Sequence, residues 1–341
     1  MLSATNNEVV AATGADEGYA LPLAVTVRSA IDSLSADARL RLFIIDGGLS
    51  PETRDRLEAS WQDPRVCIEW VDPDIGAVEH LPVSDHVSTT CYLRLMLPEC
   101  LPGDIGKLIY FDADMLIRRD LTELYAEPLG DDLALAVQEM TAPWIDSELA
   151  TADYPRRHPY LSAARPVANY RELGLRPEAM YFNSGLLVID AARWRREDVG
   201  GRVFDCLEAN RDHVLWWDQY GLNVVLSDQW RALDPRWNQT AGAFAYPSWR
   251  ESPLGEEAFR NLRRDPWIVH YCSPTKPWHY FCDHPFRKDF YRAVRRTEWR
   301  DWRPERPEGV LPLGYEFYRQ KLQREFKRVR ASTIGRLRRA A

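Results

Sequence analysis

Short apolar runs alternate with stretches of helical periodicity in the first part of the chain. Residues 8–13, 41–46 and 66–71 are apolar runs of strand length, which predicts three strands. Residues 21–34 carry apolar side chains near the helical period, which predicts a helix between the first two strands. Strands joined by helices through short connections favour right-handed crossovers, so we expect an α/β fold with a mostly parallel central sheet flanked by helices.

The later part of the chain continues this pattern and adds one irregular segment. Residues 133–137, 181–190 and 266–271 predict further strands, and residues 214–226 predict a helix. Residues 142–178 are rich in Pro, Arg and Tyr and have no clear period, which we interpret as a long loop over a ligand site.

One apolar run is followed directly by two nearby aspartates. Residues 107–111 predict a strand that leads directly to Asp112, Ala113 and Asp114. In an extended backbone, residues two apart lie on one face, so the two carboxylates can converge on one cation while Ala113 leaves the backbone accessible. Hard oxygen ligands suit magnesium or manganese, although the same pattern also occurs in solvated turns without a metal ion.

A histidine and a lysine form a second candidate group. His270 ends the predicted strand 266–271, and Lys276 follows six residues later in a proline-rich loop. A histidine at such a position is often a hydrogen-bonded core residue. A metal ion, an imidazole and an ammonium group together, however, suit a diphosphate ligand.

Composition narrows the function classes. The chain has 341 residues, is 45% hydrophobic and carries a formal net charge of −7, which leaves room for one large α/β domain with an appendage. An acidic chain argues against nucleic acid as a partner. The six cysteines show no Cys-x-x-Cys spacing, and no stretch resembles a signal peptide or a membrane span, so we expect a cytoplasmic protein with reduced thiols.

Six motifs occur in order along the chain: Asp16-Glu17-Gly18-Tyr19, Tyr92-Leu93-Arg94-Leu95, Phe111-Asp112-Ala113-Asp114, Tyr181-Phe182-Asn183-Ser184-Gly185, Asp218-Gln219 and His270-Tyr271-Cys272 with Lys276-Pro277-Trp278. Together they resemble glycosyltransferase family 8, and in particular its bacterial lipopolysaccharide galactosyl- and glucosyltransferases. The resemblance covers about residues 8–282. It implies a GT-A-type, Rossmann-like fold, a divalent cation (usually Mn²⁺, or else Mg²⁺), a UDP-sugar donor and retention of anomeric configuration.

The resemblance also implies roles for single residues. Gln219 matches the position of a side-chain oxygen near the anomeric carbon, and with Asp218 it is the expected catalytic pair. Because an amide is a poor nucleophile, we favour front-face attack over a covalent glycosyl-enzyme. The other implied roles are uracil binding by Asp16 and Tyr19, metal ligation by Asp112, Asp114 and His270, phosphate neutralisation by Lys276, and donor-site contacts by Arg94, Ala113, Asn183 and Ser184 together with Asp112, Asp218 and Gln219.

Three positions depart from the family pattern. Gly18 replaces a frequent Asn, and Ser273-Pro274 replaces a Gly-containing phosphate loop, so both bear on donor affinity. Tyr220 replaces an acid that often follows the Asp-Gln pair, and a phenol cannot supply a carboxylate's charge.

The resemblance also suggests a division of the chain. We expect a GT-A glycosyltransferase domain over residues 1–285 and a Trp- and Pro-rich segment with a basic amphipathic tail over residues 286–341. From Tyr315 to Ala341 there are nine Lys or Arg against two Glu. Such a tail can contact the anionic inner face of a membrane, and the alternative is a solvated helix that packs on the domain.

The expected function is transfer of a hexose from a UDP-hexose to a glycan or lipid-linked glycan acceptor. Two alternatives stay open. A phosphohydrolase of the haloacid dehalogenase type also places Asp-x-Asp after an apolar strand, although there the motif normally opens the domain. A sugar-nucleotide-binding protein without turnover is the other, because of the changes at Ser273 and Tyr220.

Overall fold

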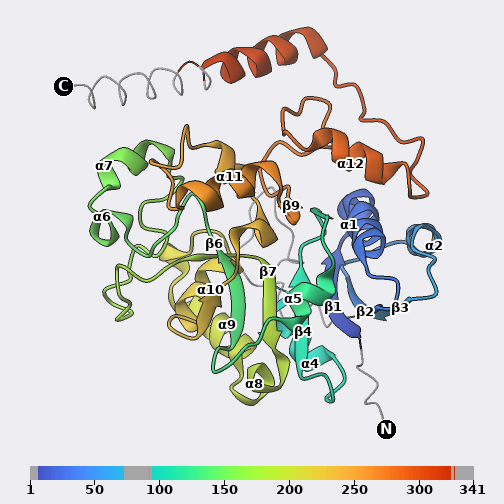
Figure 1. Cartoon of the computed structure of the whole chain (residues 1–341), viewed down its shortest axis with the longest axis horizontal. Coiled ribbons are helices and arrows are strands. Elements are labelled where there is room, and N and C mark those ends of the chain that lie inside the picture. Colours follow the sequence, from blue (N-terminus) through green and yellow to red (C-terminus); the bar gives the residue numbers. More distant parts are fainter. Residues whose placement is uncertain (1–6, 73–91, 93, 324–325, 327–341) are drawn as a thin grey trace.

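A seven-stranded sheet runs through the molecule in the order β3-β2-β1-β4-β7-β6-β8 (Figure 1). The computed structural model describes residues 7–72, 92, 94–323 and 326. The strands of this sheet are β1 (Glu8–Ala15), β2 (Arg39–Asp46), β3 (Val66–Val71), β4 (Lys107–Phe111), β6 (Ala134–Gln138), β7 (Phe182–Asp190) and β8 (Trp230–Ala232).

The N-terminal half of the sheet is parallel, as the sequence predicts. Strand β1 pairs in parallel with both β2 and β4, and β2 pairs in parallel with β3. Helix α1 (Ala20–Ser33) and helix α2 (Pro51–Ser60) make the crossovers, and Ser50 caps α2 by accepting from the Thr53 N–H with Pro51 at the first helical position. The C-terminal half is mixed, because β7 runs antiparallel to β4 and β6 while β8 is parallel to β6.

Alternate residues of the strands fill two core layers. Val9, Ala11 and Ile109 face the layer that includes α1. Val10, Ala12 and Leu108 face the layer that includes α8 (Ala191–Arg196), α9 (Val199–Ala209) and α10 (Asp218–Val225). Both faces of the sheet are therefore covered, as expected for an α/β protein. Further α-helices among the described residues are α4 (Leu97–Cys100), α5 (Leu121–Ala126), α11 (Glu256–Arg264) and α12 (Arg287–Val294).

A second, two-stranded sheet lies beside the first. Strand β5 (Met115–Ile117) pairs antiparallel with β9 (Ile268–His270), and Met115 is opposite His270 in the register. This pairing brings two segments far apart in the sequence to one place, next to the end of β4.

The segment 142–178, predicted as a long loop, contains short helices. They are α6 (Ser147–Ala150), α7 (Tyr154–Arg157) and the 3-10 helix η4 (His158–Tyr160). Each has only three or four residues, which is too short to show a helical period in sequence. The remaining 3-10 helices are η1 (Glu17–Tyr19), η3 (Arg94–Met96), η5 (Arg211–His213), η6 (Pro235–Asn238) and η7 (Ala241–Phe244).

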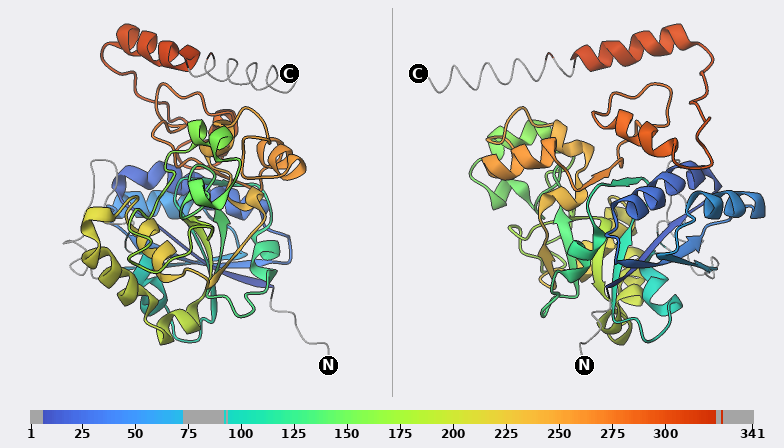
Figure 2. Two further views of the ribbon diagram at one scale, coloured as in Figure 1. Left: turned by 90° about the vertical axis from the view of Figure 1, so that its left-hand side faces the viewer. Right: turned by 45° about the vertical axis from the view of Figure 1, so that its right-hand side comes forward.

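The segment after residue 285 has two parts. Helix α12 packs on α1, and Phe290, Val294 and Trp299 are buried in the same core layer as α1. Residues 310–323 then form a helix at the edge of the molecule (Figure 2), where Phe317 stacks on Phe281. In the part of the chain that the structure describes, no helix combines the length and apolar character needed to cross a membrane.

Candidate active site

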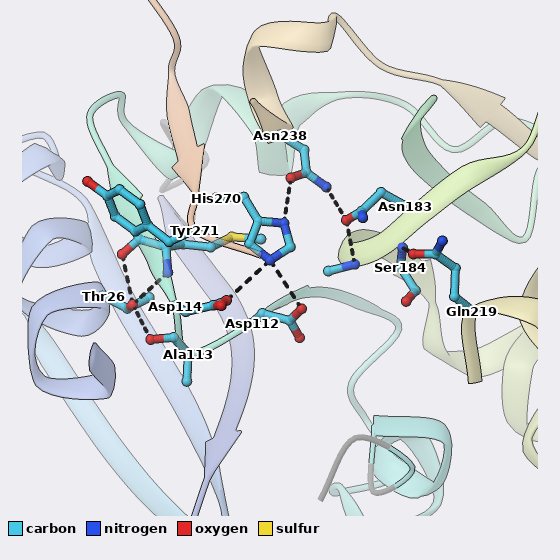
Figure 3. Close-up of polar contacts among 12 residues, drawn as sticks. Thr26, Asp112, Ala113, Asp114, Asn183, Ser184, Gln219, Asn238, His270 and Tyr271 are labelled. Atoms are coloured by element: carbon cyan, nitrogen blue, oxygen red, sulfur yellow. Dashed lines mark hydrogen bonds and ion pairs between the residues drawn. The ribbon is translucent and has the colours of Figure 1, made fainter. Parts of the chain in front are cut away.

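Two aspartates and a histidine converge at the junction of the two sheets. His270 Nε2 lies 3.2 Å from Asp114 Oδ1 and 3.5 Å from Asp112 Oδ2 (Figure 3). One ligand atom from each of the three residues lies within 4.8 Å of the others, so all three can reach a single ion. Two carboxylate oxygens and one imidazole nitrogen are suitable donors for a divalent cation such as Mn²⁺ or Mg²⁺. The residues therefore fit the expected metal site.

The two aspartates lie in a turn rather than in a strand. Strand β4 ends at Phe111, and β5 begins at Met115 in the other sheet, so the expectation of a continuous extended backbone through Asp112 and Asp114 is wrong. The Asp112 N–H donates to Gly185 O at 2.8 Å, and the Tyr271 N–H donates to Asp114 O at 2.9 Å. The chain must change sheets here, and the turn still aims both carboxylates at His270.

Gly185 allows these groups to approach closely. A Cβ atom on Gly185 would lie 2.3 Å from His270 Cε1 and 2.7 Å from Asp112 Oδ2. Neither side chain can retreat easily, because both are held by other partners. The glycine in the Asn183-Ser184-Gly185 motif is therefore required by the close approach of Asp112 and His270.

The charges around the cluster favour ionised aspartates. Burial alone would raise the pKa of Asp112, but Arg94 and His270 bring it below its ordinary value. Burial opposes ionisation of Asp114 too, yet Lys276 and His270 hold its pKa far below the usual range. Burial lowers the pKa of His270, but Cys272 and Asp114 raise it well above its ordinary value in the metal-free protein. The site is thus built to hold positive charge.

Lys276 completes one side of the cluster. Its Nζ donates to Asp114 Oδ2 at 2.7 Å and to Tyr271 O at 2.8 Å. Burial lowers its pKa, but Asp114 more than offsets this and keeps the amine charged. The ammonium lies 5.9 Å from the centre of the Tyr19 ring and 5.7 Å from that of Trp278.

Arg94 joins the Asp112, Asp114 and His270 cluster to the start of α10. Its Nη1 lies 3.1 Å from Asp112 Oδ1, and its Nε lies 3.2 Å from Asp218 Oδ2. Nη1 also donates to Ser184 O at 2.9 Å. The predicted donor-site residues Arg94, Asp112, Ser184 and Asp218 are therefore one connected group.

Helix α10 begins at Asp218, four residues later than predicted. Trp216 and Trp217 have φ angles of 64° and 51°, so the chain turns sharply there instead of continuing a helix. Gln219 Oε1 accepts from the Ser184 N–H at 3.0 Å. Burial raises the pKa of Asp218 to about 6, although Arg94 lowers it. The two predicted catalytic residues are thus both buried and lie beside Ser184.

Both the oxygen and the nitrogen of the Asn183 side-chain amide make hydrogen bonds. Its Oδ1 accepts from Asn238 Nδ2 at 2.9 Å and from the Gly185 N–H at 3.1 Å, and its Nδ2 donates to Glu139 at 2.9 Å. Asn238 Oδ1 lies 2.9 Å from His270 Nδ1. Sequence reasoning missed both Glu139 and Asn238. Glu139 follows a buried apolar run just as Asp112 does, so the same signal could have found it.

The predicted uracil-binding residues lie near the lysine side of the site. Asp16 Oδ1 accepts from the Tyr19 N–H at 3.2 Å and caps η1, and the Tyr19 ring meets the edge of Trp278 at 5.9 Å between ring centres. Ala113 is buried, and its carbonyl accepts from the Thr26 hydroxyl at 2.6 Å.

The three departures from the family pattern have different surroundings. Tyr220 is fully buried, and its hydroxyl donates to Asn169 Oδ1 at 2.7 Å, so it is a core residue. The Ser273 hydroxyl donates to Thr275 O at 2.9 Å and shapes the loop before Lys276. A Cβ on Gly18 would lie 3.3 Å from Asp16 Oδ1, so a larger residue there would crowd that carboxylate.

The fold and this site define a glycosyltransferase of the GT-A type. The galactosyltransferase LgtC, solved with donor and acceptor sugar analogs, has a similar structure, with a TM-score of 0.67 at 25% identity over 88% of this chain and 98% of the other. The profile described as glycosyl transferase family 8 matches residues 10–282, and the chain belongs to this family. Family membership sets aside the phosphohydrolase alternative.

Two bacterial proteins are similar in sequence to most of this chain. General stress protein A of Bacillus subtilis is 28% identical over 84% of this chain and 92% of its own length. The lipopolysaccharide glucosyltransferase WaaO of Escherichia coli is 26% identical over 74% of this chain and 67% of its own length.

Proposed function

We propose that the chain transfers glucose or galactose from a UDP-sugar to a glycan acceptor, with retention of anomeric configuration. The acceptor is lipopolysaccharide or another cell-surface glycan, either free or linked to lipid. The observation that carries the proposal is the cluster of Asp112, Asp114 and His270 with Lys276 beside it, because this group of charges suits a diphosphate leaving group.

The donor would lie across the junction of the two sheets. When bound, Mn²⁺ or Mg²⁺ on Asp112, Asp114 and His270 supplies positive charge to the departing diphosphate. Lys276 would move its ammonium from Asp114 toward a phosphate oxygen, and Asp16 and Tyr19 would hold the uracil. Arg94, Ala113, Asn183 and Ser184 would line the sugar side of the site.

Gln219 and Asp218 would face the reacting sugar. The Ser184 N–H already donates to Gln219 Oε1, which orients the amide and leaves it a weak nucleophile. We therefore favour front-face attack, in which the departing phosphate oxygen takes the acceptor's proton. Side-chain oxygens near the anomeric carbon would stabilise the positive charge that develops on the sugar.

The proposed acceptor class rests on the named relatives. A lipopolysaccharide glucosyltransferase of Escherichia coli and a lipopolysaccharide 1,3-galactosyltransferase of Salmonella typhimurium both match most of this chain. Their donor sugars differ, so they support a hexose without selecting one.

We also place the enzyme in the cytoplasm, with the C-terminal helix in contact with the anionic inner face of the membrane. Leu311, Tyr315, Tyr318 and Leu322 are all exposed and follow the spacing of one helix face. The tail carries many cations, which would complement anionic lipid headgroups.

A donor-hydrolysis screen tests the proposal. Purified full-length chain is incubated with UDP-glucose, UDP-galactose and other UDP-sugars, with Mn²⁺ or with chelator, and released UDP is measured. We expect at least one UDP-hexose to be hydrolysed, and we expect chelation and Asp114→Ala each to lower the rate by about a hundredfold or more.

Turnover that persists after both treatments would refute the metal assignment. Metal-dependent binding of a UDP-hexose without hydrolysis, and without transfer to any acceptor tested, would instead support a sugar-nucleotide-binding protein without turnover.

A further inference from the structure

A row of buried hydrogen bonds runs from His270 to a carboxylate that the proposed reaction does not use. His270 Nδ1 lies 2.9 Å from Asn238 Oδ1, Asn238 Nδ2 donates to Asn183 Oδ1 at 2.9 Å, and Asn183 Nδ2 donates to Glu139 Oε2 at 2.9 Å. His270, Asn238, Asn183 and Glu139 are all buried. Figure 3 shows the part of this row from His270 to Asn183.

Glu139 is held as an acceptor at its far end. Its Oε1 accepts from the Thr141 N–H at 3.1 Å and from the Thr141 hydroxyl at 3.2 Å. Its Oε2 accepts from Asn183 Nδ2, so both oxygens of this side chain act as acceptors.

The donor at Oε2 and the Gly185 N–H together fix the direction of the row. Asn183 must turn its NH₂ toward Glu139, and its oxygen then meets the Gly185 N–H, which can only donate. Asn238 must in turn present its NH₂ to that oxygen and its own oxygen to His270. His270 Nδ1 therefore faces an acceptor and carries a proton, so Nε2 is the nitrogen whose proton a metal ion would replace.

We propose that Glu139 is a positioning residue that selects the metal-binding tautomer of His270 through Asn183 and Asn238. The inference rests on the proposed function, because it assumes that His270 ligates the metal ion through Nε2. Glu139 itself touches neither the metal ligands nor, in this role, the substrate. Groups that orient a ligating histidine through its second nitrogen usually strengthen metal binding.

The first test compares Glu139→Gln with the wild type. A glutamine at this position has nearly the same shape, but it must place its NH₂ against either the Thr141 N–H or the Asn183 NH₂. Either choice places two donors against each other, so the orientations of the side-chain amides in the row are less strongly fixed. We measure Mn²⁺ affinity in the presence of UDP from the electron paramagnetic resonance signal of free Mn²⁺, and we expect the dissociation constant to rise about tenfold.

Glu178→Gln is the matched control. The Glu178 side chain is 56% exposed and lies 3.6 Å from Arg176, and no hydrogen bond joins it to the row among the described residues, so this variant should bind Mn²⁺ like the wild type. Melting temperatures of both variants show whether a general loss of stability accompanies any change.

The second test separates tautomer selection from a general structural effect. Asn238→Asp places an acceptor-only group directly against His270 Nδ1, so the histidine no longer depends on Glu139 for its tautomer. We expect Glu139→Gln to change the Mn²⁺ dissociation constant by less than about twofold on the Asn238→Asp background. A tenfold loss on both backgrounds would overturn the proposal, because a merely structural role does not depend on residue 238.

A spectroscopic test needs only the single variant. In full-length chain labelled with ¹⁵N-histidine, with Mg²⁺ and UDP, long-range ¹H–¹⁵N spectra report which ring nitrogen is protonated, and His270→Gln assigns the signal. We expect a protonated Nδ1 in the wild type and a shift toward the other tautomer in Glu139→Gln. Identical His270 signals in the two proteins would contradict the proposal.

Different results would contradict the proposed metal site and the proposed role of Glu139. If the wild type binds no Mn²⁺ with UDP, or if His270→Gln binds it as well as the wild type, the proposed metal site is wrong. If the wild type binds Mn²⁺, His270→Gln does not, and Glu139→Gln equals the wild type, only the role of Glu139 is wrong.

Discussion

Asp218 is a buried carboxylate whose surroundings compensate its charge only in part. Its side chain is 4% exposed, and its nearest cation is the Arg94 guanidinium, with Nε at 3.2 Å from Oδ2. Arg94 also serves Asp112, so its charge is shared between two acids. Burial therefore dominates and raises the pKa of Asp218 from 3.8 to about 6. In the proposed reaction, the ionised form would be the one that stabilises positive charge on the sugar.

The raised pKa predicts a pH-dependent cost to stability. Between about pH 4 and pH 6 the unfolded chain loses the Asp218 proton while the native chain keeps it, so stability falls as pH rises through this range. Asp218→Asn cannot ionise. We expect the free energy of unfolding of the wild type, relative to Asp218→Asn, to fall by about 1 to 2 kcal/mol between about pH 5 and pH 7.5.

Urea unfolding of the metal-free proteins, followed by circular dichroism, checks this difference. A gap between the two proteins that stays constant with pH would show that Asp218 ionises normally. A gap that changes in the opposite direction would mean that Arg94 outweighs burial.

At the scale of single residues, the sequence predicts the site residues that end a strand. It does not predict the side chains that orient them. Asp112 and His270 each end a buried apolar run, so strand pattern alone suggested both. Asn238 lies in η6, 32 residues before its partner His270. No local pattern predicts that this turn approaches β9, because the contact depends on the packing of elements distant in sequence.

At the scale of elements, α1 holds the turn between the two sheets. The Thr26 hydroxyl donates to the carbonyls of Ala113 and Met115, at 2.6 and 2.8 Å, and accepts from the Met115 N–H at 3.0 Å. The Ser29 hydroxyl accepts from the Ile117 N–H at 2.9 Å. Two polar side chains on the buried face of α1 thus replace backbone partners that the change of sheet removes.

Thr26→Val tests this link. Valine has nearly the same shape but leaves the Met115 N–H and two carbonyls with fewer partners in a buried region. We expect the free energy of unfolding to fall by about 2 kcal/mol. We also expect weaker Mn²⁺ binding with UDP, because Asp114 lies between the two residues that Thr26 holds.

Two controls separate the hydroxyl from the fit of the side chain. Thr26→Ser keeps the hydroxyl and should retain most of the Mn²⁺ affinity. Thr13 is fully buried on neighbouring β1, and its hydroxyl has no hydrogen-bond partner among the described residues. Thr13→Val should therefore be neutral or should stabilise by up to about 1 kcal/mol. Equal losses for Thr26→Val and Thr13→Val would contradict the proposed link.

Elements with local signals were predicted well, and those set by distant pairing were not. Ser50 and Pro51 mark the start of α2, and the structure begins the helix there. Strand β5 has three residues and exists because it pairs with β9, about 150 residues later, so its sequence alone reads as a continuation of β4. The late start of α10 has the same character, since tertiary packing holds Trp216 and Trp217 at positive φ.

At the scale of the whole molecule, the packed body extends further along the chain than the change in composition suggests. Composition changes near residue 285, yet Phe290 and Val294 are 1% exposed and Trp299 is 7% exposed in the core layer of α1. Beyond this point, Phe317 stacks on Phe281 with ring centres 5.5 Å apart, whereas Leu311 is 83% and Leu322 70% exposed. Packing therefore assigns α12 to the body, while the helix at 310–323 has little contact with it.

Two truncations should consequently differ in stability. Ending the chain after residue 285 removes three large buried side chains, each worth about 1.5–3 kcal/mol, which together approach the stability of a typical domain. We expect that protein to be unfolded or aggregated. Ending the chain after residue 308 removes one stacked ring pair worth about 1 kcal/mol, so the melting temperature should fall by only about 2–4 °C.

The truncation after residue 308 tests the proposed membrane contact separately from the stability of the body. The exposed stripe of Leu311, Tyr315, Tyr318 and Leu322 adds apolar area to a segment in which cations outnumber acids. Binding that combines both should need anionic lipid and should weaken with salt, because headgroup attraction is screened. In flotation with vesicles rich in phosphatidylglycerol, we expect the full chain to float at low salt and the chain ending at residue 308 to stay in solution. Neither protein should float with vesicles of phosphatidylcholine alone. Since the shorter chain keeps the body and the proposed metal site, it should also keep UDP-sugar hydrolysis. Equal flotation of the two proteins would contradict the membrane role of the tail and would leave the proposed chemistry unaffected.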